Sequence, residues 1–471
     1  MDCAGGNETH TDGSRDYLMA TKAKRVLILG GGFGGIYAAL KLEKLLRRHD
    51  DLEVTLITRD NYFLFTPMLP EVAAGELEQN TIVNPLRKLL RRVKSFVGTI
   101  EAIDLNARHV IVSHGFDGHI HELPYDQLIV ALGARTNFFD LPGVEASCLT
   151  LKTLGDAIAV RNQLITDLEE ANSECAAGER QPLLTFIVAG GGFAGVETLG
   201  GINDFVREAI RFYPNLHPDY LRFVLVTPDE LILPELNRKL GIYAQRKLTM
   251  RGVEIITGAK VSAISGGIVK LTSGEKIQAN TLIWSAGTAP NPLIAKLSAP
   301  KRNGRIVVDA YLGVEGWPGL WAVGDCASVS SSRAGGFYPP TAQHAMREGN
   351  LVARNVAATL YGGQKKPFRY RTLGQVAAIG RRTGVASILG VNFSGFVAWW
   401  LWRTIYLCKL PRLEKKVRIA LDWTLDLCFA KDFACVTMPP GGSKRAASMV
   451  RVPDELVSRD ESASNSISAV S

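Results

Sequence analysis

The sequence predicts an α/β protein that contains two doubly wound units, each large enough to bind a dinucleotide. Three observations support this prediction. Short apolar runs of strand length alternate with segments of helical periodicity, as in parallel sheets that are covered by helices. A glycine-rich loop follows the first strand and opens a helix. A second loop of the same kind follows a later strand, so that the two loops begin at Gly30 and Gly190.

The first unit has a strand at 25–29, a helix at 36–46 and a second strand at 54–57, which together form a βαβ unit. The loop glycines have the spacing GxGxxG: Gly30, Gly32 and Gly35. The first glycine allows a tight turn, the second lets the backbone approach a pyrophosphate, and the third lets the helix pack on the strand. The free N–H groups of the helix N-terminus then hold the anion. A plain glycine-rich turn is the alternative.

The second unit repeats the pattern with strands at 185–188 and 223–226. Its loop glycines are Gly190, Gly192 and Gly195. Two loops, each between a strand and a helix, favour two bound dinucleotides over two unrelated turns.

Both units lack the acidic residue that usually ends the second strand and binds the ribose hydroxyls. Thr58 and Thr227 stand there instead, and Asp60 and Asp229 follow two residues later as substitutes. A threonine hydroxyl can bond a ribose but does not repel a 2′-phosphate, so the choice between NADH and NADPH stays open at this point. No basic residue closely follows Thr227, which favours NADH.

Length and composition limit the class of protein. A chain of 471 residues has room for roughly three domains of ~150 residues. A hydrophobic fraction of 46% excludes wholesale disorder. The mean hydropathy of +0.07 is high for a soluble enzyme, yet no run reaches the ~18 apolar residues of a clear transmembrane helix.

The net charge of +8 suits an anionic membrane surface or a nucleic acid, and composition does not choose between them. Seven scattered cysteines without a C-x-x-C pair argue against a disulfide framework or a zinc cluster, so no metal is expected. The acidic N-terminus lacks the apolar core of a secretory signal. We therefore expect a reduced protein that faces the cytosol.

Further motifs add a family resemblance. Leu132-Gly133-Ala134 and Ser285-Ala286-Gly287 each end a strand, and Gly324-Asp325 follows the strand Leu320–Val323. With the two loops, these segments resemble the flavoproteins of the glutathione-reductase type over about residues 24–390. The resemblance implies two nested Rossmann-like domains, with FAD at the first loop, Asp325 on the flavin ribitol and the nicotinamide nucleotide at the second loop.

Two stretches point to one branch of this superfamily. Residues 61–75 (NYFLFTPMLPEVAAG) and 340–349 (PTAQHAMREG) resemble the N-H-x-L-F-x-P-L-L-x-x-V-A-x-G and A-Q-x-A-x-Q-x-G motifs of type II, or alternative, NADH:quinone oxidoreductases. Gln343 matches the first glutamine of the quinone motif and Arg347 replaces the second. The replacement predicts a quinone pocket with altered polarity or headgroup preference.

Other branches fit less well. Disulfide reductases carry a C-x-x-x-x-C on the first helix, and residues 36–46 contain no cysteine. Sulfide:quinone reductases need a spaced cysteine pair beside the flavin, whereas Cys148 and Cys175 stand in predicted loop or linker contexts. Sulfide:quinone oxidoreductase is kept as the enzymatic alternative. A low-turnover flavin redox sensor is the non-enzymatic one, because of the substitutions at Thr58, Thr227 and Arg347.

Composition at the two ends, together with the resemblance between them, divides the chain into six segments. They are a disordered arm (1–23), the first part of the FAD-binding domain (24–150), the NAD(H)-binding domain (151–290), the second part of the FAD-binding domain (291–392), C-terminal membrane-anchoring helices (393–435) and a disordered tail (436–471).

The same resemblance assigns binding residues. Those expected at FAD are Gly30, Gly32, Phe33, Gly34, Gly35, Thr58, Arg59, Gly133, Asp325 and Gln343. Those expected at NADH are Gly190, Gly192, Phe193, Gly195, Glu197, Thr227 and Gly287. Those expected at the quinone are Pro67, Gln343 and Arg347.

Glu197 and Gln343 are the candidate catalytic residues. Glu197 lies just inside the helix after the second loop, where it can position the nicotinamide and relay protons. The alternative is a first-turn carboxylate favoured by the helix dipole. Gln343 can hydrogen-bond a quinone carbonyl or the flavin edge, and its alternative is a helix-start amide.

The C-terminal segment has a composition of its own. Four of the seven Trp residues fall within 393–431. A second helix is expected at 414–429, with the apolar stripe Val417, Leu421, Leu425 and Cys428. Tryptophan together with snorkelling Arg and Lys is typical of helices that lie in the headgroup layer of a membrane. A dimer interface, or helices packed on the flavin domain, is the alternative.

These observations predict an FAD-dependent enzyme that passes electrons from NADH to a membrane quinone without pumping protons. Its expected place is peripheral, on the cytoplasmic face of the cell inner membrane, held there by residues 393–435. A homodimer is compatible with the sequence, and no nucleic-acid partner is expected.

Overall fold

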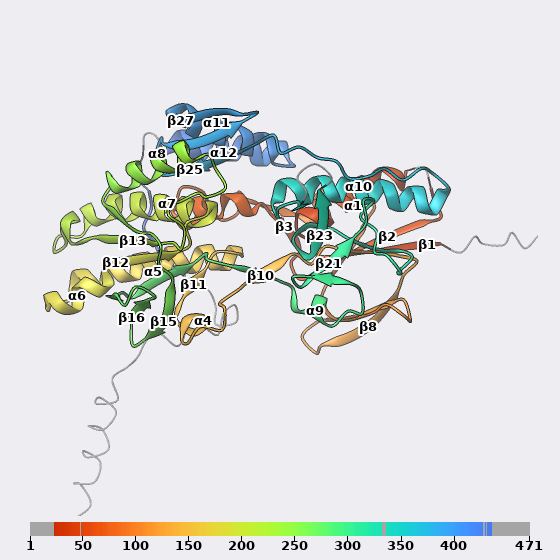
Figure 1. The fold of residues 1–471 in the computed structure, drawn as a ribbon, viewed down its shortest axis with the longest axis horizontal. Coiled ribbons are helices and arrows are strands. Elements are labelled where there is room, and N and C mark those ends of the chain that lie inside the picture. The colour runs from red at the N-terminus through yellow and green to blue at the C-terminus, as the bar shows by residue number, and fades with distance from the viewer. Residues whose placement is uncertain (1–22, 48, 332–335, 427–428, 430, 436–471) are drawn as a thin grey trace, which may run out of the picture.

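The computed structural model describes residues 23–47, 49–331, 336–426, 429 and 431–435. The predicted arm, except residue 23, and the predicted tail lie outside the described residues. Figure 1 shows the two sheet-containing units side by side, with the C-terminal elements above the left-hand unit, which contains β12 and β13.

The first unit is built on a five-stranded parallel sheet with the order β22-β9-β1-β2-β5. Its strands come from both halves of the chain: β1 (Lys24–Leu29), β2 (Leu52–Thr58), β5 (Lys94–Val97), β9 (Gln127–Val130) and β22 (Leu320–Ala322). The predicted βαβ unit is present, and its helix α1 (Phe33–Leu45) begins three residues before the predicted start. It does so because Gly32 itself is the N-cap.

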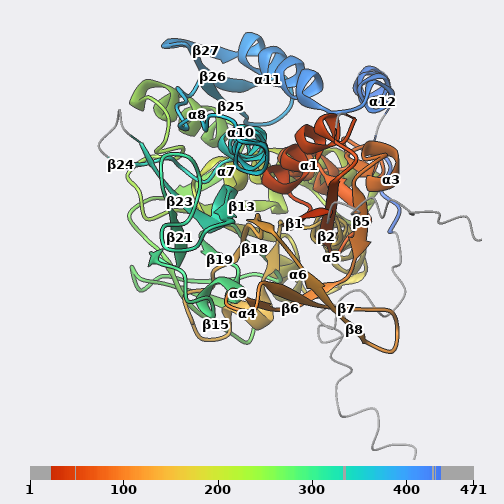
Figure 2. The same cartoon turned by 90° about the vertical axis from the view of Figure 1, so that its right-hand side faces the viewer.

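Helix α10 (Ala342–Tyr361) packs closely along α1, as Figure 2 shows. A Cβ atom on Gly349 of α10 would collide with the carbonyl oxygen of Gly34 and come within 3.0 Å of the Ala38 amide nitrogen. This close contact holds α10, whose second residue is Gln343, against α1.

The second unit has a five-stranded parallel sheet with the order β11-β18-β12-β13-β14. Its strands are β11 (Leu149–Thr150), β12 (Thr185–Ala189), β13 (Arg222–Val226), β14 (Val253–Ile256) and β18 (Thr281–Trp284). Its main helices are α5 (Leu154–Ser173), α6 (Ala177–Leu183), α7 (Phe193–Ala209) and α8 (Arg238–Thr249). The two units are linked by the antiparallel pair β10 (Ala134–Thr136) and β19 (Thr288–Pro290). The predicted boundary at 150/151 is therefore slightly late, because β11 already belongs to the second sheet.

Smaller sheets and helices complete the two units. The remaining strands are β3 (Tyr62–Leu64) with β4 (Val83–Pro85); β6 (Thr99–Asp104), β7 (His109–His114) and β8 (His119–Pro124); β15 (Val261–Ser265), β16 (Ile268–Leu271) and β17 (Lys276–Gln278); and β20 (Lys301–Arg302), β21 (Arg305–Val308), β23 (Ala327–Ser331) and β24 (Gly336–Phe337). The short helices are η1 (Thr66–Met68), α2 (Leu69–Ala73), α3 (Leu86–Leu89), α4 (Val144–Ser147), η2 (Ile210–Phe212), η3 (Pro218–Tyr220), α9 (Pro292–Ala295) and η4 (Gly324–Cys326).

The C-terminal unit starts with an antiparallel meander and ends with two helices. Its elements are β25 (Gly374–Ala378), β26 (Gly384–Ile388), β27 (Val391–Gly395), α11 (Phe396–Lys409) and α12 (Leu413–Leu425). Helix α11 packs on this meander, so the predicted boundary at 392/393 is wrong because it falls inside β27. The second predicted helix ends at Leu425 rather than 429, and Cys428 of its predicted stripe lies outside the described residues.

Three of the four C-terminal tryptophans are buried, which corrects their assignment to a headgroup layer. Trp399, Trp402 and Trp423 are at most 9% exposed, and only Trp400, at 54%, faces outward. Arg403 does not snorkel toward solvent either, because its guanidinium lies 4.1 Å and 4.6 Å from the rings of Trp399 and Trp423. Among the described residues, no helix is both long enough and apolar enough to cross a membrane.

The contact between α1 and α10 gives a stability prediction. We expect Gly349→Ala to lower the free energy of unfolding by ~1–3 kcal/mol, because the added methyl group overpacks two helix backbones. Urea denaturation of the flavin-loaded protein measures this. Gly178→Ala is the matched control, because a Cβ at Gly178 in α6 meets no described atom within 4 Å. Equal midpoints for the two variants would contradict the proposed packing.

Candidate functional site

The first glycine loop forms an open cradle at the carboxyl end of β1. Gly30 has φ +109°, and a Cβ there would strike the carbonyl oxygen of Ala131. Gly32 caps α1 without a side-chain hydrogen bond, and a Cβ on it would meet no described atom within 4 Å. The first N–H groups of α1 therefore border open space, which is the geometry that binds a pyrophosphate. The residues present fit a dinucleotide.

The second loop repeats this arrangement at the end of β12. Gly190 has φ +121°, and Gly192 caps α7 without a side-chain bond. A difference lies in Glu235, whose Oε1 is 3.4 Å from the position of a Cβ on Gly192. The sequence pattern did not predict that Glu235 lies beside this loop, because its position in the sequence is distant from the loop and matches no motif.

Thr58 and Thr227 lie beneath their loops. A Cβ on Gly31 would come within 2.5 Å of the Thr58 Oγ1, and a Cβ on Gly191 within 2.6 Å of the Thr227 Oγ1. Thr227 is fully buried, and its Oγ1 lies 3.4 Å from the Asp229 carboxylate. The two threonines thus support the turns, and the acidic group at the second loop is supplied by Asp229.

The other predicted nucleotide residues separate into two groups. Two of them have structural roles. The Phe33 ring is buried against Phe63 and Phe65. At Gly287 there is no room for a side chain, because a Cβ atom there would lie 2.6 Å from the Phe139 ring. The rest border the loops or follow them: Arg59 is exposed at the end of β2, Gly133 has φ +65° with open space around it, and Phe193 is half-buried at the start of α7.

Asp325 stands in η4, directly after β22 of the first sheet. Burial raises the pKa of its carboxyl, while Lys152 and Arg305 oppose that rise. The preceding N–H, of Gly324, donates to Glu348 at 2.7 Å. Glu348 thus fixes the turn that carries Asp325, and burial raises the pKa of Glu348 to about 7.

Glu197 points away from the N-terminus of its own helix. Its Oε1 accepts hydrogen bonds from the Ala378 backbone N–H (3.1 Å) and from the Trp402 indole (2.7 Å). Burial raises the pKa of this carboxyl to about 8 despite both hydrogen bonds. The helix-dipole alternative does not match this geometry, because both donors belong to the C-terminal unit.

Gln343 and Arg347 sit one turn apart on α10. The Gln343 Oε1 accepts from the Tyr370 hydroxyl at 2.6 Å, and its amide donates to the Gly374 carbonyl at 3.4 Å. The Arg347 guanidinium lies 4.0 Å from the centroid of the Tyr370 ring and donates to the Gln343 carbonyl at 2.9 Å. Burial, and Arg347 after it, lower the pKa of Lys409.

Strand β25 is bound by both candidate catalytic residues, one at each end. Its first residue, Gly374, binds Gln343, and its last, Ala378, binds Glu197. Four residues of strand separate these anchors by roughly 13 Å. Pro67 lies on η1, next to the buried Phe65 whose ring is 6.1 Å from that of Tyr406.

Sequence reasoning missed Tyr370, Trp402, Tyr406 and Glu71. The spacing of Trp402 and Tyr406, four residues apart on one helix, was an available signal that both face the same neighbour. Tyr370 and Glu71 carried none, because their partners are distant in sequence.

The whole chain resembles known proteins. The "Pyridine nucleotide-disulphide oxidoreductase" family matches residues 24–349, and the "NDH2 C-terminal domain" family matches residues 373–432. The type II NADH:quinone oxidoreductase Ndh of Mycobacterium tuberculosis is 33% identical, covering 85% of this chain and 87% of that protein. The demethylphylloquinone reductase NdbB of a Synechocystis species is 32% identical, covering 86% and 96%.

Solved structures share the fold. NDH2 of Plasmodium falciparum in complex with NADH has a TM-score of 0.81 at 20% identity, covering 87% of this chain and 99% of that one. The sulfide:quinone oxidoreductase of Aquifex aeolicus has a TM-score of 0.65 at 18% identity, covering 87% and 96%.

The raised pKa of Glu197 predicts a pH-dependent stability. Between the ordinary carboxyl value of ~4.3 and about 8, the folded protein retains a proton that the unfolded chain releases, so stability is lost as the pH rises through this window. We expect Glu197→Gln to gain thermal stability over the unaltered protein between about pH 6 and pH 8. Thermal unfolding midpoints at several pH values measure this. The control is Glu235→Gln, because this carboxylate is exposed. If the midpoint difference between Glu197→Gln and the unaltered protein stayed constant with pH, the assignment would be contradicted.

Proposed function

The chain belongs to the type II NADH:quinone oxidoreductases, and we propose how its residues carry out that family's reaction. The enzyme is a flavoprotein that transfers electrons from NADH through FAD to a quinone. Sulfide:quinone oxidoreductase is not favoured, because that likeness rests on the fold at 18% identity. The transfer proceeds without proton pumping.

FAD supplies the redox chemistry when bound, by accepting a hydride and releasing electrons to the second substrate. The open cradle at Gly32 and the first N–H groups of α1 hold its pyrophosphate. Asp325 binds the ribitol, and the start of α10 with Gln343 borders the ring. Phe33 contributes its backbone, since its side chain is buried in the core.

NADH binds at the second loop, where Gly192 takes the role of Gly32. The carboxylates of Asp229 and Glu235 border this loop. Negative charge there suits the free ribose hydroxyls of NADH and repels the 2′-phosphate of NADPH. These contacts support NADH as the preferred donor.

The quinone headgroup binds between Gln343, Arg347 and Pro67, with Glu197 at the other end of β25. The Gln343 amide and the Arg347 guanidinium are hydrogen-bond donors for a quinone oxygen. Glu197, whose carboxyl keeps its proton near neutral pH, holds a proton that the reduced quinone requires.

Paired glycine variants test the assignment of the two loops. We expect Gly32→Val to fold, since the side chain enters open space, and to purify without flavin because the valine fills the pyrophosphate cradle. We expect Gly192→Val to keep FAD and to lose flavin reduction by NADH. Flavin absorbance and stopped-flow reduction measure the two effects.

Each variant is the control for the other. A Gly32→Val protein with full flavin content, or a Gly192→Val protein reduced by NADH at the normal rate, would reject the corresponding assignment. Steady-state NADH oxidation with a soluble quinone tests the function itself. Negligible turnover would favour the redox-sensor alternative.

A membrane surface is the proposed location, with the quinone entering from the lipid. Eight exposed apolar residues gather on or beside α11 and α12: Phe396, Val397, Trp400, Leu413, Val417, Leu421, Leu425 and Phe429. The outward apolar stripe of α12 is bordered by the exposed Arg418. This arrangement suits a helix lying in the interface of an anionic bilayer. We place the protein peripherally on the cytoplasmic face of the cell inner membrane; a homodimer through the same surface is the competing use.

Charge substitutions on this surface test membrane binding without removing buried tryptophans. We expect Val417→Asp with Leu421→Asp to abolish co-sedimentation with anionic vesicles while NADH oxidation with a soluble quinone continues. The control is Phe116→Asp with Ile120→Asp, two exposed apolar residues on the β7–β8 hairpin. Unchanged sedimentation of the α12 variant would refute the anchor, and a fall in its molecular mass in solution would identify a dimer interface.

A further inference from the structure

A second carboxyl, Glu71, is buried beside Glu197 and has no role so far. It lies on α2, which packs against α7, and it is 7% exposed. Its Oε1 accepts a hydrogen bond from the Trp423 indole at 3.1 Å, while its Oε2 has no hydrogen-bond partner. An unpaired buried carboxylate oxygen is costly, so this group is held in its protonated form.

The titratable groups around Glu71 come from three parts of the chain. Glu76 follows α2, Arg403 and Tyr406 lie on α11, and Glu197 lies on α7. Burial raises the pKa of Glu71, Glu76 and then Glu197 raise it further, and Arg403 with the Trp423 hydrogen bond opposes them.

Tyr406 connects the two carboxyls. Burial raises the pKa of its hydroxyl, and the charges of Glu197 and then Glu71 raise it further, so both acids lie within electrostatic reach of Tyr406. The Tyr406 ring is 4.8 Å from the Trp402 ring, and the Trp402 ring is 6.5 Å from that of Trp423. The two indoles that bind the carboxyls are thus themselves neighbours.

A small cleft lies beside Trp423, whose indole binds Glu71. Its volume is about 20 Å³, room for roughly one water. Its lining includes Glu76, Arg403, Trp423 and Asp426. The lining also includes Arg381, whose side chain is 48% exposed, so the cleft reaches the surface.

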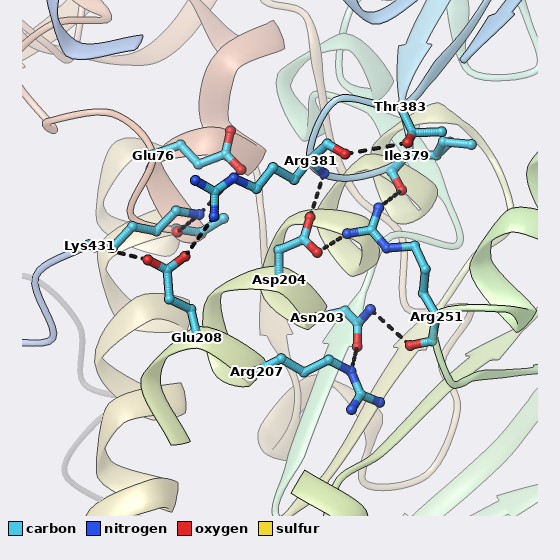
Figure 3. A network of polar contacts seen from close by, with 11 residues as sticks. Glu76, Asn203, Asp204, Arg207, Glu208, Arg251, Ile379, Arg381, Thr383 and Lys431 are labelled. Carbon is cyan, nitrogen blue, oxygen red and sulfur yellow. Dashed lines mark hydrogen bonds and ion pairs between the residues drawn. The ribbon is translucent and has the colours of Figure 1, made fainter. Parts of the chain in front are cut away.

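Ion pairs hold the mouth of this cleft in place. Lys431 Nζ lies 3.3 Å from the Glu76 carboxylate, and Arg381 lies 3.5 Å from that of Glu208 (Figure 3). Asp204 accepts from the Arg381 N–H and pairs with Arg251. Glu76 is thereby kept 15% exposed, between solvent and Glu71.

The proton balance of the reaction requires such an entrance. The quinone gains two electrons and two protons, and NADH supplies two electrons and one proton as hydride. One further proton must come from water. We propose that Glu71 delivers this proton from the cleft at Glu76 to Glu197, past Tyr406. The proposal rests on the proposed NADH:quinone reductase function.

The steps conserve protons and charge. Glu197 releases its carboxyl proton toward the quinone oxygen, by way of water along β25, and becomes a carboxylate. Glu71 then passes its own proton to the Glu197 carboxylate, and a proton taken up from bulk solvent through the cleft beside Trp423 returns Glu71 to its protonated form. Electrons reach the quinone separately, so an acceptor that takes no proton does not need this route.

Glu71→Gln is the test, because glutamine keeps the oxygen that accepts from Trp423 and lacks the transferable proton. We expect NADH oxidation with a soluble quinone to fall about 10-fold or more, within the range attributed to general acids. Oxidation with ferricyanide, which takes electrons alone, should change less than about 2-fold. Glu71→Asp should recover part of the quinone rate.

Two further measurements exclude a merely structural effect. Trp423→Phe removes the indole donor and keeps the acid, so any loss should affect the quinone and ferricyanide rates alike, and the ratio of the two rates should stay closer to normal than in Glu71→Gln. The quinone rate of the unaltered enzyme should fall at alkaline pH as the carboxyls lose their protons, and Glu71→Gln should lack this part of the profile. Equal losses with both acceptors, or a normal quinone rate in Glu71→Gln at every pH, would overturn the relay. An unaltered protein that uses ferricyanide and no quinone would instead reject the proposed function.

Discussion

The burial of two carboxyls beneath the C-terminal unit is the constraint on which the rest of the site depends. A buried acid requires hydrogen-bond donors, and the donors to Glu197 and Glu71 are the indoles of Trp402 and Trp423. Neither indole belongs to a dinucleotide-binding unit. Helices α11 and α12 must therefore dock on the flavoprotein body for these acids to keep their protons in a non-aqueous setting.

This docking also explains why charged residues of the C-terminal helices face the protein interior. Lys415 turns inward and donates to the Asn80 carbonyl, and Arg403 lies between two tryptophan rings. These polar groups and three of the tryptophans face the body, while Val417, Leu421 and Leu425 of α12 lie outside. The same packing that protects the acids thus creates the apolar surface that we assign to the membrane.

The two dinucleotide loops show the same local solution used twice. In each, a left-handed glycine turns the chain, a second glycine caps the helix, and a threonine at the end of the next strand fits under the glycine between them. The threonines are therefore a packing requirement of the turn. We therefore assign the choice between NADH and NADPH to Asp229 and Glu235, which lie beside the second loop.

The sequence alone determined the features that depend on local pattern. Apolar runs, glycine spacing and motif order predicted both βαβ units, the two loops, the family and the places of Glu197 and Gln343 near the starts of their helices. Tertiary structure decided what depends on distant partners: the inward face of α12, the strand β25 that joins Gln343 to Glu197, and the burial of Glu71. Periodicity shows that a helix has two unlike faces, but which face is buried depends on the partners it meets, and Trp423 lies 352 residues from Glu71.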